Sequence, residues 1–466
     1  MPGVIVGFVA VLVLAVVGAH YYVWRRLVRA TTARGSRARR WLTSAVVGLG
    51  LLVPLTLVGA RAGWGYWLAW PGYLWMATLL YLTLWTAALE IPRGVANLVP
   101  RRRPAPAVPV EAPVEAPVEA PVSAEVEAAV TVPATPPDAP VRATGAVSPG
   151  PAPEADAPAG GEPAPGPAPE ADMPSDPGPA PIGRRLFIAR TAAAVAGVGA
   201  LATVGYGVRT ALGDPVVELV EVPLPKLDAR MDGLRFAVVS DIHLGPTTGL
   251  NHTRRIVRMI NNMQADVVAI VGDLMDGTVA ELGGLARPLR DLESRYGAYF
   301  VTGNHEYFTP GGPSEWIEEL RELGVRPLLN ERVEIAHGGA VLDLAGVNDL
   351  NGATAERDGR PENGGPDFAR ALGGRDAARP VVLLAHQPVQ AAEAARHGVD
   401  LQLSGHTHGG QMFPVNFIVP VQQPIVSGLG TVDGTKVYVS RGAGYWGPPV
   451  RVGAPPEITL LRLRAT

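Results

Sequence analysis

The residues best suited to chemistry are Asp, Asn and His in short clusters that recur along the second half of the chain. The clusters are SDIH (240–243), GDLMD (272–276), GNHE (303–306), AHQP (385–388) and GHTH (405–408). They supply nitrogen and oxygen donors without sulfur: Asp241, His243, Asp273, Asn304, His386, His406 and His408. One metal ion does not need so many ligands, whereas two ions sharing a bridging carboxylate do. Such a pair suits phosphoryl displacement, because it stabilises the attacking and leaving oxygens.

Each cluster follows a short apolar run that predicts a buried strand. The runs are 234–240, 266–271, 298–301, 381–384 and 401–403, and an amphipathic stretch, 253–263, lies between the first two. Continuous apolar strands alternating with helices predict an α/β fold with a sheet covered on both faces. Ligands of open α/β sheets gather at the carboxyl edge, so we expect the clusters to converge there.

The spacing within the clusters adds local detail. Asp241 and His243 are two residues apart, as are His406 and His408, so on a strand each pair would project from one side. The neighbouring glycines 272, 303 and 405 suit sharp exits from strands, where a side chain would obstruct close approach. Mixed imidazole and carboxylate ligation favours manganese, iron or zinc over magnesium or calcium.

Composition excludes several other classes. The chain has 466 residues and no cysteine, which rules out disulfides, a thiolate nucleophile and cysteine-based zinc sites. It contains no G-x-S-x-G elbow and no G-x-x-x-x-G-K-[ST] loop, so a serine hydrolase and a P-loop NTPase are not expected. Residues 182–466 are slightly acidic, so no nucleic acid partner is expected.

The ordered set DIH, GDLMD, GNHE, a later His before Pro, and GHTH resembles the calcineurin-like metallophosphoesterase superfamily over about residues 230–460. The resemblance implies a four-layer α/β/β/α sandwich and two divalent metal ions. The GHTHGGQ block (405–411) and the closing segment 440–461 are similar to bacterial membrane-associated phosphodiesterases, relatives of enzymes that cleave the pyrophosphate of UDP-sugar lipid precursors.

Carried over residue by residue, the resemblance implies roles for each donor. One metal would be held by Asp241, His243 and His408, the other by Asn304, His386 and His406, and Asp273 would bridge them. A hydroxide between the metals would attack phosphorus. His305 would protonate or stabilise the leaving oxygen. Asp276 would support ligand geometry. Arg441 and Tyr445 would either contact the substrate or belong to a structural turn.

The first hundred residues predict a membrane region (1–103). Its uncharged runs 3–24, 41–60 and 64–89 are each long enough to cross a bilayer as a helix. Seven Arg lie in 25–40 and three more at 101–103, so the positive-inside rule places these loops in the cytoplasm and the N-terminus outside.

Two further segments lead to the globular domain. Residues 104–181 hold 22 of the 46 prolines and predict a disordered, acidic tether, with a P-x-x-P docking site as the alternative. Residues 182–212 combine GRRLFIAR, which resembles a twin-arginine export signal, with a fourth apolar span. Either a signal or an ordinary start-transfer helix would put the domain, 213–466, outside the cytoplasm.

These patterns together predict a multi-pass protein of the cytoplasmic membrane. Its extracytoplasmic domain would hydrolyse a phosphodiester or pyrophosphate bond, and the bilayer makes a lipid-linked or cell-envelope phosphate ester the natural substrate. A phosphomonoesterase or protein phosphatase is a second hypothesis. A third is a non-catalytic sensing or partner-binding protein with a structural metal domain, although such a site needs only four ligands.

Overall fold

A computed structural model describes residues 2–61, 65–92, 94, 183–245, 247–309, 311–357 and 364–466. The predicted linker, 104–181, lies outside the described residues. The N-terminal helices and residues 182–466 belong to one compact unit. The boundaries that we expect between membrane region, linker and domain stay predictions.

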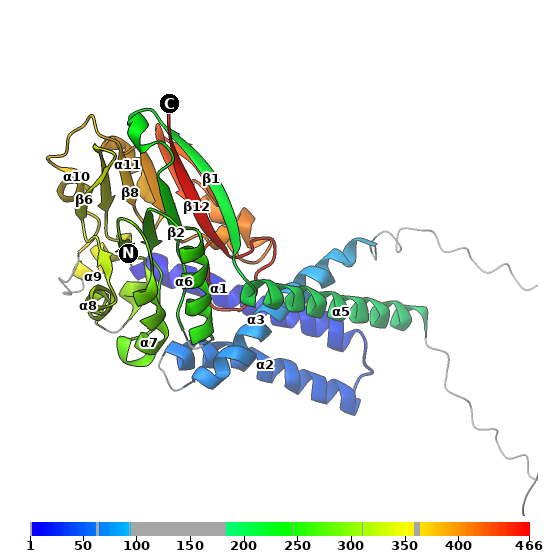
Figure 1. The fold of residues 1–466 in the computed structure, drawn as a ribbon. Helices are drawn as coiled ribbons and strands as arrows, with labels where there is room; N and C mark the ends of the chain where they lie inside the picture. Colours follow the sequence, from blue (N-terminus) through cyan, green and yellow to red (C-terminus); the bar gives the residue numbers. More distant parts are fainter. Residues whose placement is uncertain are drawn as a thin grey trace, which may run out of the picture. The chain divides into compact units, whose positions relative to one another are not determined.

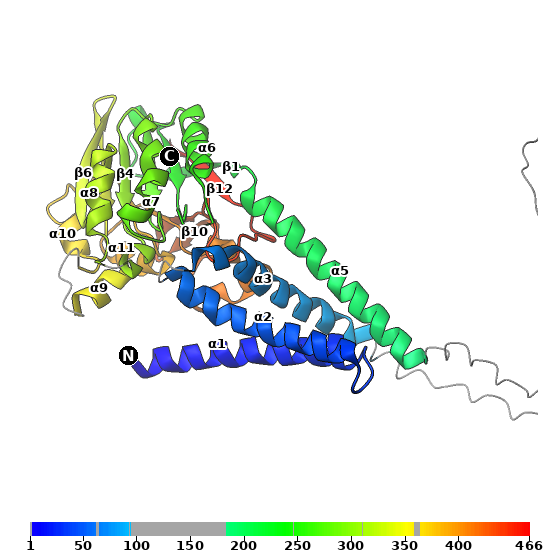
Figure 2. The same ribbon diagram turned by 90° about the horizontal axis from the view of Figure 1, so that it is seen from below.

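Among the described residues, four helices are long and apolar enough to cross a membrane: α1 (Pro2–Val23, prolonged by the π-helical segment η1, Trp24–Arg29), α2 (Arg37–Arg61), α3 (Tyr66–Ala88) and α5 (Arg184–Leu212). Helix α3 contacts α1, α2 and α5, and Figure 2 shows the four elongated helices beside one another. Small side chains such as Ala77 and Ala200 are fully buried between them. Aliphatic side chains elsewhere on these helices face outward, which suits a hydrocarbon environment.

The described residues after α5 form two six-stranded sheets. The first has the order β1-β12-β2-β3-β4-β5 and the second β10-β11-β9-β8-β7-β6. Strands β2 to β5 are parallel, as are β7, β8, β9 and β11. The strands are β1 (Val216–Leu224), β2 (Arg235–Val239), β3 (Val267–Val271), β4 (Ala298–Val301), β5 (Val325–Pro327), β6 (Glu331–His337), β7 (Ala340–Gly346), β8 (Val381–Leu384), β9 (Leu401–Ser404), β10 (Gly428–Val432), β11 (Thr435–Val439) and β12 (Glu457–Ala465).

The two sheets pack face to face, with helices outside. Phe236 and Leu403, from different sheets, are fully buried in one core between the sheets. Ile256 and Trp316 close the outer face of the first sheet, and Phe368 helps to close that of the second. The outer helices are α6 (Leu250–Asn262), α7 (Val279–Ala286), α8 (Ser314–Glu322), α9 (Leu350–Arg357), α10 (Phe368–Leu372) and α11 (Ala391–Arg396) (Figure 1).

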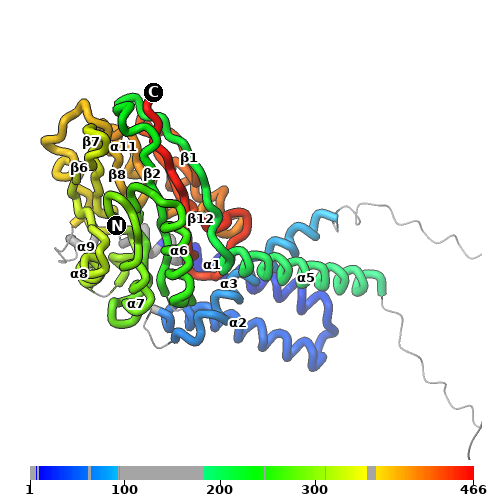
Figure 3. Tube along the Cα trace, in the orientation of Figure 1, coloured from blue at the N-terminus to red at the C-terminus, as the bar shows by residue number. Residues whose placement is uncertain are grey.

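The α/β fold class and the four-layer sandwich are therefore confirmed. Each sheet is covered on both faces, by the other sheet on one side and by helices on the other, as the strand pattern predicted. A fully buried strand has the same apolar run whether a helix or a second sheet covers its other face, so the runs did not distinguish the two arrangements. The segment that closes the domain, β12, runs parallel to the segment that opens it, β1, and Figure 3 shows the two side by side.

Candidate metal centre

All the predicted ligands lie at strand ends on one edge of the sandwich. The first sheet contributes the residues after β2, β3 and β4, and the second contributes those after β8 and β9. The two sheets face each other, so their carboxyl edges meet. The structure thus brings together Asp241, His243, Asp273, Asn304, His386, His406 and His408, most of them buried.

One group of donors joins the two sheets through Asp241, His243 and His408. The Nε2 atoms of His243 and His408 are 3.1 Å apart, and His408 Nε2 is 3.3 Å from Asp241 Oδ1. All three side chains are buried. Two imidazoles and a carboxylate aimed at one point are a donor set that suits a divalent cation.

A second group contains Asp273, His386 and His406. His386 Nε2 lies 3.2 Å from Asp273 Oδ2, and His406 Nδ1 lies 2.8 Å from Asn304 Oδ1. Asp273 Oδ2 is also 3.9 Å from His243 Nε2 in the first group. The Asp273 carboxylate therefore lies between the groups, where a bridging ligand would have to be.

The hydrogen bonds of the histidine rings fit metal binding. His386 Nδ1 donates to the carbonyl oxygen of Val271 (2.8 Å), which leaves a lone pair on Nε2 in the neutral ring. That Nε2 atom is buried and makes no hydrogen bond among the described residues. Likewise His243 Nδ1 is 3.0 Å from Asp276 Oδ1, and its Nε2 faces the first group. Hydrogen bonds to the second ring nitrogen orient ligating histidines in metalloproteins.

The backbone around the ligands is strained. Asp241, His243, Asp273, His406 and His408 have φ values of 52°, 48°, 51°, 71° and 51°. Positive φ is uncommon for residues other than glycine and costs energy, and such residues cluster at functional sites. These positive φ values also correct the prediction that residues two apart project from one side of a strand. Residues 241, 243, 406 and 408 lie after their strands and not on them, so left-handed turns, and not the strand period, direct these side chains.

Two of the glycines are required by close approach. A Cβ on Gly405 would lie 1.8 Å from Ser240 Oγ, and one on Gly303 would lie 2.2 Å from Asp273 Oδ1. Neither contact is possible, so a side chain at position 405 would push apart loops of the two sheets, and one at position 303 would push apart two neighbouring loops of the first sheet. This agrees with the prediction that these glycines allow sharp exits from strands where a side chain would obstruct close approach.

His305 forms a third group of possible donors with His243 and Asp273, and its side chain is 11% exposed. Its Nδ1 is 2.7 Å from Asp276 Oδ1, the oxygen that also contacts His243. Burial lowers the pKa of His305, but the charges of Asp273 and Asp276 outweigh this and raise the pKa to about 9. Burial likewise opposes ionisation of Asp276, yet the two histidines hold the pKa of its carboxyl well below the ordinary value. A protonated imidazole beside the donor groups can give a proton to a leaving oxygen.

The two weaker candidates have protein partners. Arg441 forms ion pairs with Glu457, at 2.5 Å, and with Glu218. Tyr445 is buried, and its hydroxyl donates to the carbonyl oxygen of Thr247. These contacts agree with the structural-turn alternative, and contact with a substrate stays a prediction for both residues.

The sequence reasoning missed two buried charges at the site. The Glu306 carboxylate accepts from the main-chain N–H groups of Gly303, Asp273 and Leu274 at 2.5, 3.1 and 2.8 Å, and so holds two ligand loops together. Its position directly after His305 in the GNHE cluster was the available signal. Burial first, and then the charge of Asp273, raise the pKa of Glu306 to about 7.

Arg451 is the other missed residue, and no local signal marked it. Its guanidinium is fully buried and donates to the carbonyl oxygen of Gly444 at 2.8 Å and to His408 Nδ1 at 3.1 Å. Burial lowers the pKa of Arg451 to about 10, so the group stays charged at neutral pH. It therefore fixes the orientation of a predicted ligand that lies 43 residues earlier.

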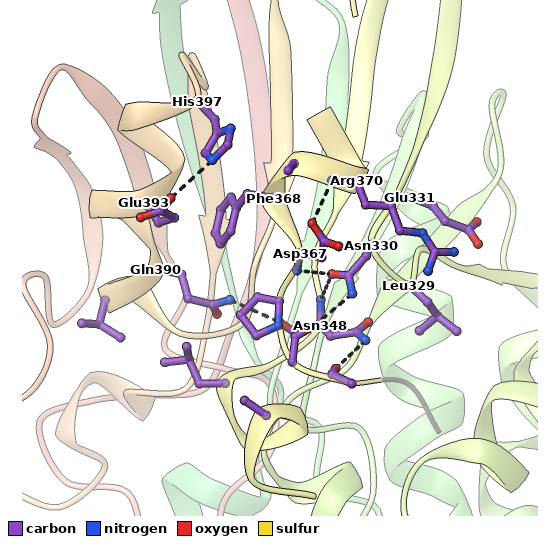
Figure 4. Close-up of a pocket in the computed structure, with 17 residues that line it drawn as sticks. Leu329, Asn330, Glu331, Asn348, Asp367, Phe368, Arg370, Gln390, Glu393 and His397 are labelled. Carbon is purple, nitrogen blue, oxygen red and sulfur yellow. Dashed lines mark hydrogen bonds and ion pairs between the residues drawn. The ribbon is translucent and has the colours of Figure 1, made fainter. Parts of the chain in front are cut away.

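A separate cavity of about 1100 Å³ lies between β6, α10 and α11 (Figure 4). None of the predicted ligands lines it. Asn330 organises its wall, because Oδ1 accepts from the N–H groups of Asn348 and Asp367, and Nδ2 donates to the carbonyl oxygen of Gly365. Asn330 is thus bonded to three other residues of this wall, and the candidate metal centre lies elsewhere.

The fold and the site agree with comparisons to known proteins. Residues 234–410 match the family described as calcineurin-like phosphoesterase. An uncharacterized metallophosphoesterase of Aquifex aeolicus is 34% identical over 228 residues, covering 48% of this chain and 83% of the relative. One from Helicobacter pylori is 37% identical over 268 residues, covering 56% and 68%. The chain therefore belongs to the calcineurin-like metallophosphoesterases, a family of phosphoric ester hydrolases.

A third relative combines the domain with a membrane region. It is named transmembrane protein with metallophosphoesterase domain, comes from Bos taurus, and is 44% identical over 268 residues. The match covers 56% of this chain and 59% of the relative. The chain thus spans about six tenths of the length of this relative.

Proposed function

We propose that this protein hydrolyses a phosphodiester or pyrophosphate bond with two divalent metal ions, manganese, iron or zinc. The observation that carries the proposal is the two neighbouring donor groups, with Asp273 of the second group 3.9 Å from His243 of the first. A structural metal site is closed by four ligands, whereas two adjoining groups that include an amide oxygen exceed that need. Cations bound there would activate water as a nucleophile and neutralise charge on the phosphoryl oxygens.

The chain's own residues would hold the cations, supply a proton and position the histidine rings. Asp241, His243 and His408 would hold one cation, Asn304, His386 and His406 the other, and Asp273 both. His305 would give the leaving oxygen a proton from its imidazolium. Asp276 would hold His243 and His305 in position, because one carboxylate oxygen contacts both rings.

We also infer that the four long helices anchor the domain outside the cytoplasm. Arg26 pairs with Glu90 at 2.9 Å, and Arg190 Nε donates to the carbonyl oxygen of Thr31, so the arginine-rich ends of the helices lie together. At the opposite end, the hydroxyl of Tyr66 donates to Glu281 of the domain at 2.9 Å. The positive-inside rule assigns the arginine-rich end to the cytoplasm and hence the domain to the other side.

This location favours a lipid-linked or cell-envelope phosphate ester as substrate. Membrane attachment concentrates the enzyme where such esters occur. The lipid linkage is an inference from location, and the chemistry of the metal centre is compatible with soluble diesters as well.

The test uses the full chain in detergent, stripped of metal and supplied again with Mn, Zn, Fe or Mg singly. Hydrolysis of bis-p-nitrophenyl phosphate and of p-nitrophenyl phosphate is measured for the wild type, for Asn304→Ala, for His305→Ala and for a control, His397→Ala. His397 pairs with Glu393 on α11, outside both donor groups. We expect metal-dependent diester turnover that Asn304→Ala and His305→Ala reduce at least 100-fold and His397→Ala leaves unchanged.

The other outcomes separate the alternatives. Faster turnover of the monoester would favour a phosphomonoesterase or protein phosphatase. Two bound metal equivalents without turnover of either ester would contradict hydrolysis of simple esters and favour a binding role.

A further inference from the structure

The segment that follows the GHTH cluster exposes large apolar side chains. Phe417, Ile418 and Val421 are 70, 66 and 82% exposed, and Phe413 is 50% exposed. We call these four residues, together with Trp446 (54% exposed), the apolar surface. We propose that the apolar surface inserts into the interfacial layer of the bilayer that the four helices cross, and holds the metal centre against the membrane. This goes beyond the proposed hydrolysis and rests on the membrane-spanning role inferred above.

The composition of the segment favours lipid over water or a charged partner. Residues 409–432 contain no Asp, Glu, Lys, Arg or His, in a chain that is 18% charged. Two short turns, η7 (Val415–Phe417) and η8 (Val419–Val421), carry Phe417 and Val421, with Ile418 between them, and neither turn has a buried residue. A contiguous exposed apolar area marks a protein or membrane contact.

The apolar surface is continuous with the helices. Met412 and Val452 pack against the helix cluster that contains Ala77, Tyr81 and Val204. The next residue along, Phe413, donates its main-chain N–H to the carbonyl oxygen of Val452 at 2.9 Å. Figures 1 and 2 both show the orange segment before β10 on the side of the domain that faces the helices. A bilayer surrounding these helices would meet this segment first.

The same surface reaches the metal centre. The uncharged segment starts immediately after His408. Trp446 is bonded to this segment, because its main-chain N–H donates to Gln411 Oε1 at 3.0 Å. The indole ring lies edge-on to His305, with centroids 5.8 Å apart. Tryptophan is the side chain that favours the boundary between headgroups and hydrocarbon. Insertion at this depth would present His305 and the donor groups to phosphate esters in the membrane surface.

The absence of cysteine from the chain allows a direct test. Phe417→Cys and Val421→Cys are each labelled with a fluorophore in the full chain, reconstituted into phosphatidylcholine vesicles. Leu14→Cys on α1 is the reference for lipid contact, and Arg396→Cys on α11 is the reference for water, because both side chains are exposed. Quenching is compared between a lipid with a nitroxide near its headgroup and iodide in solution.

We expect the labels at 417 and 421 to be quenched by the nitroxide lipid at least threefold more than the label at 396, and to be shielded from iodide. Labels at 417 and 421 that behave like the one at 396, while the label at 14 contacts lipid, would overturn the proposal. Shielding from both quenchers would also overturn it, because a second copy or another segment of the chain would then cover the surface.

Two controls keep this result apart from the proposed activity. A label at 14 that lacks lipid contact would contradict the membrane-spanning role, and the apolar surface proposal with it. Turnover of bis-p-nitrophenyl phosphate is measured on the same labelled proteins. If the labels are quenched by lipid but neither the labelled proteins nor the wild type turn over the diester, the result would contradict the proposed hydrolysis. The proposed membrane contact would still be supported.

Discussion

The main-chain carbonyl oxygen of Gly207, on α5, accepts a hydrogen bond of 2.9 Å from the main-chain N–H of Arg451. On either side of Arg451, Val450 and Val452 pack into the helix cluster. The Arg451 side chain turns the other way and contacts His408. One residue therefore connects the last long helix with a proposed metal ligand.

The first prediction concerns the close approach at Gly207. A Cβ there would lie 2.5 Å from Val450 Cγ1, so Gly207→Ala should force the helix and the domain apart. We expect a loss of about 1 to 3 kcal/mol, seen as a lower melting temperature of the full chain in detergent. Gly197→Ala on the same helix is the control, because its Cβ would meet nothing within 4 Å. It should be neutral or stabilising by up to about 1 kcal/mol. Equal melting temperatures of the two variants would contradict the close contact between Gly207 and Val450.

The second prediction concerns Arg451 as a positioning residue. Arg451→Met removes the donor to His408 Nδ1 and leaves the buried carbonyl oxygens of Gly444 and Ala454 without it. We expect metal affinity to fall about 10- to 100-fold, as for other partners of ligating histidines, in calorimetric titrations with Mn or Zn. Arg462→Met breaks only an exposed pair with Glu221 and should leave affinity unchanged. Unchanged metal affinity in both variants would contradict the role of Arg451 in positioning His408.

The third prediction separates positioning from folding at Asp276. Asp276→Asn keeps the shape but removes the charge that the rings of His243 and His305 share. We expect diester turnover to fall about 10- to 100-fold, with an unchanged melting temperature. Asp433→Asn, at an exposed turn with a φ of 47°, is the matched control, because Asn tolerates that conformation. Full turnover in Asp276→Asn would show that neither histidine needs the carboxylate.

The fourth prediction concerns Glu306, which accepts three main-chain hydrogen bonds. Glu306→Gln places an NH₂ group against one or more of these donors, so at least one buried N–H loses its acceptor. We expect a loss of about 1 to 3 kcal/mol and faster amide exchange at residues 273, 274 and 303, measured by mass spectrometry. Glu318→Gln, in an exposed pair with Arg321, should change stability by less than about 0.5 kcal/mol. The idea fails if exchange at those amides stays as slow as in the wild type.

The fifth prediction concerns pH and His252, on α6. Burial first, and then the nearby charge of Arg255, lower the pKa of His252 to about 4. The unfolded chain, with an ordinary histidine pKa of about 6.5, takes up this proton more readily than the folded protein. The contribution of neutral His252 to the free energy of unfolding is therefore complete above about pH 6.5. It is lost as the pH falls towards 4, by up to about 1.4 kcal/mol per pH unit. Melting curves of His252→Asn should vary less over this range than those of the wild type. Parallel curves would contradict the assignment.

The location of the candidate site could be predicted from the sequence because its signals are local. Asp241 and His243 follow directly after an apolar run that is long enough for one strand, and Asp273, Asn304, His386 and His406 do the same. The end of a strand and the type of the next residue are properties of a few neighbouring positions. The long apolar runs of the first hundred residues are local in the same sense, since length and hydropathy alone make a helix fit to cross a bilayer.

Tertiary structure decided which of these parts meet. Arg451 and His408 are 43 positions apart, and Gly207 and Arg451 are farther still, so no spacing pattern could pair them. The apolar runs alone also could not divide the strands between two sheets, because an apolar run records that a face is buried and not what buries it. The same reason applies to Phe417 and Val421: their apolar character was visible in the sequence, but only the packed structure left them exposed beside the helices.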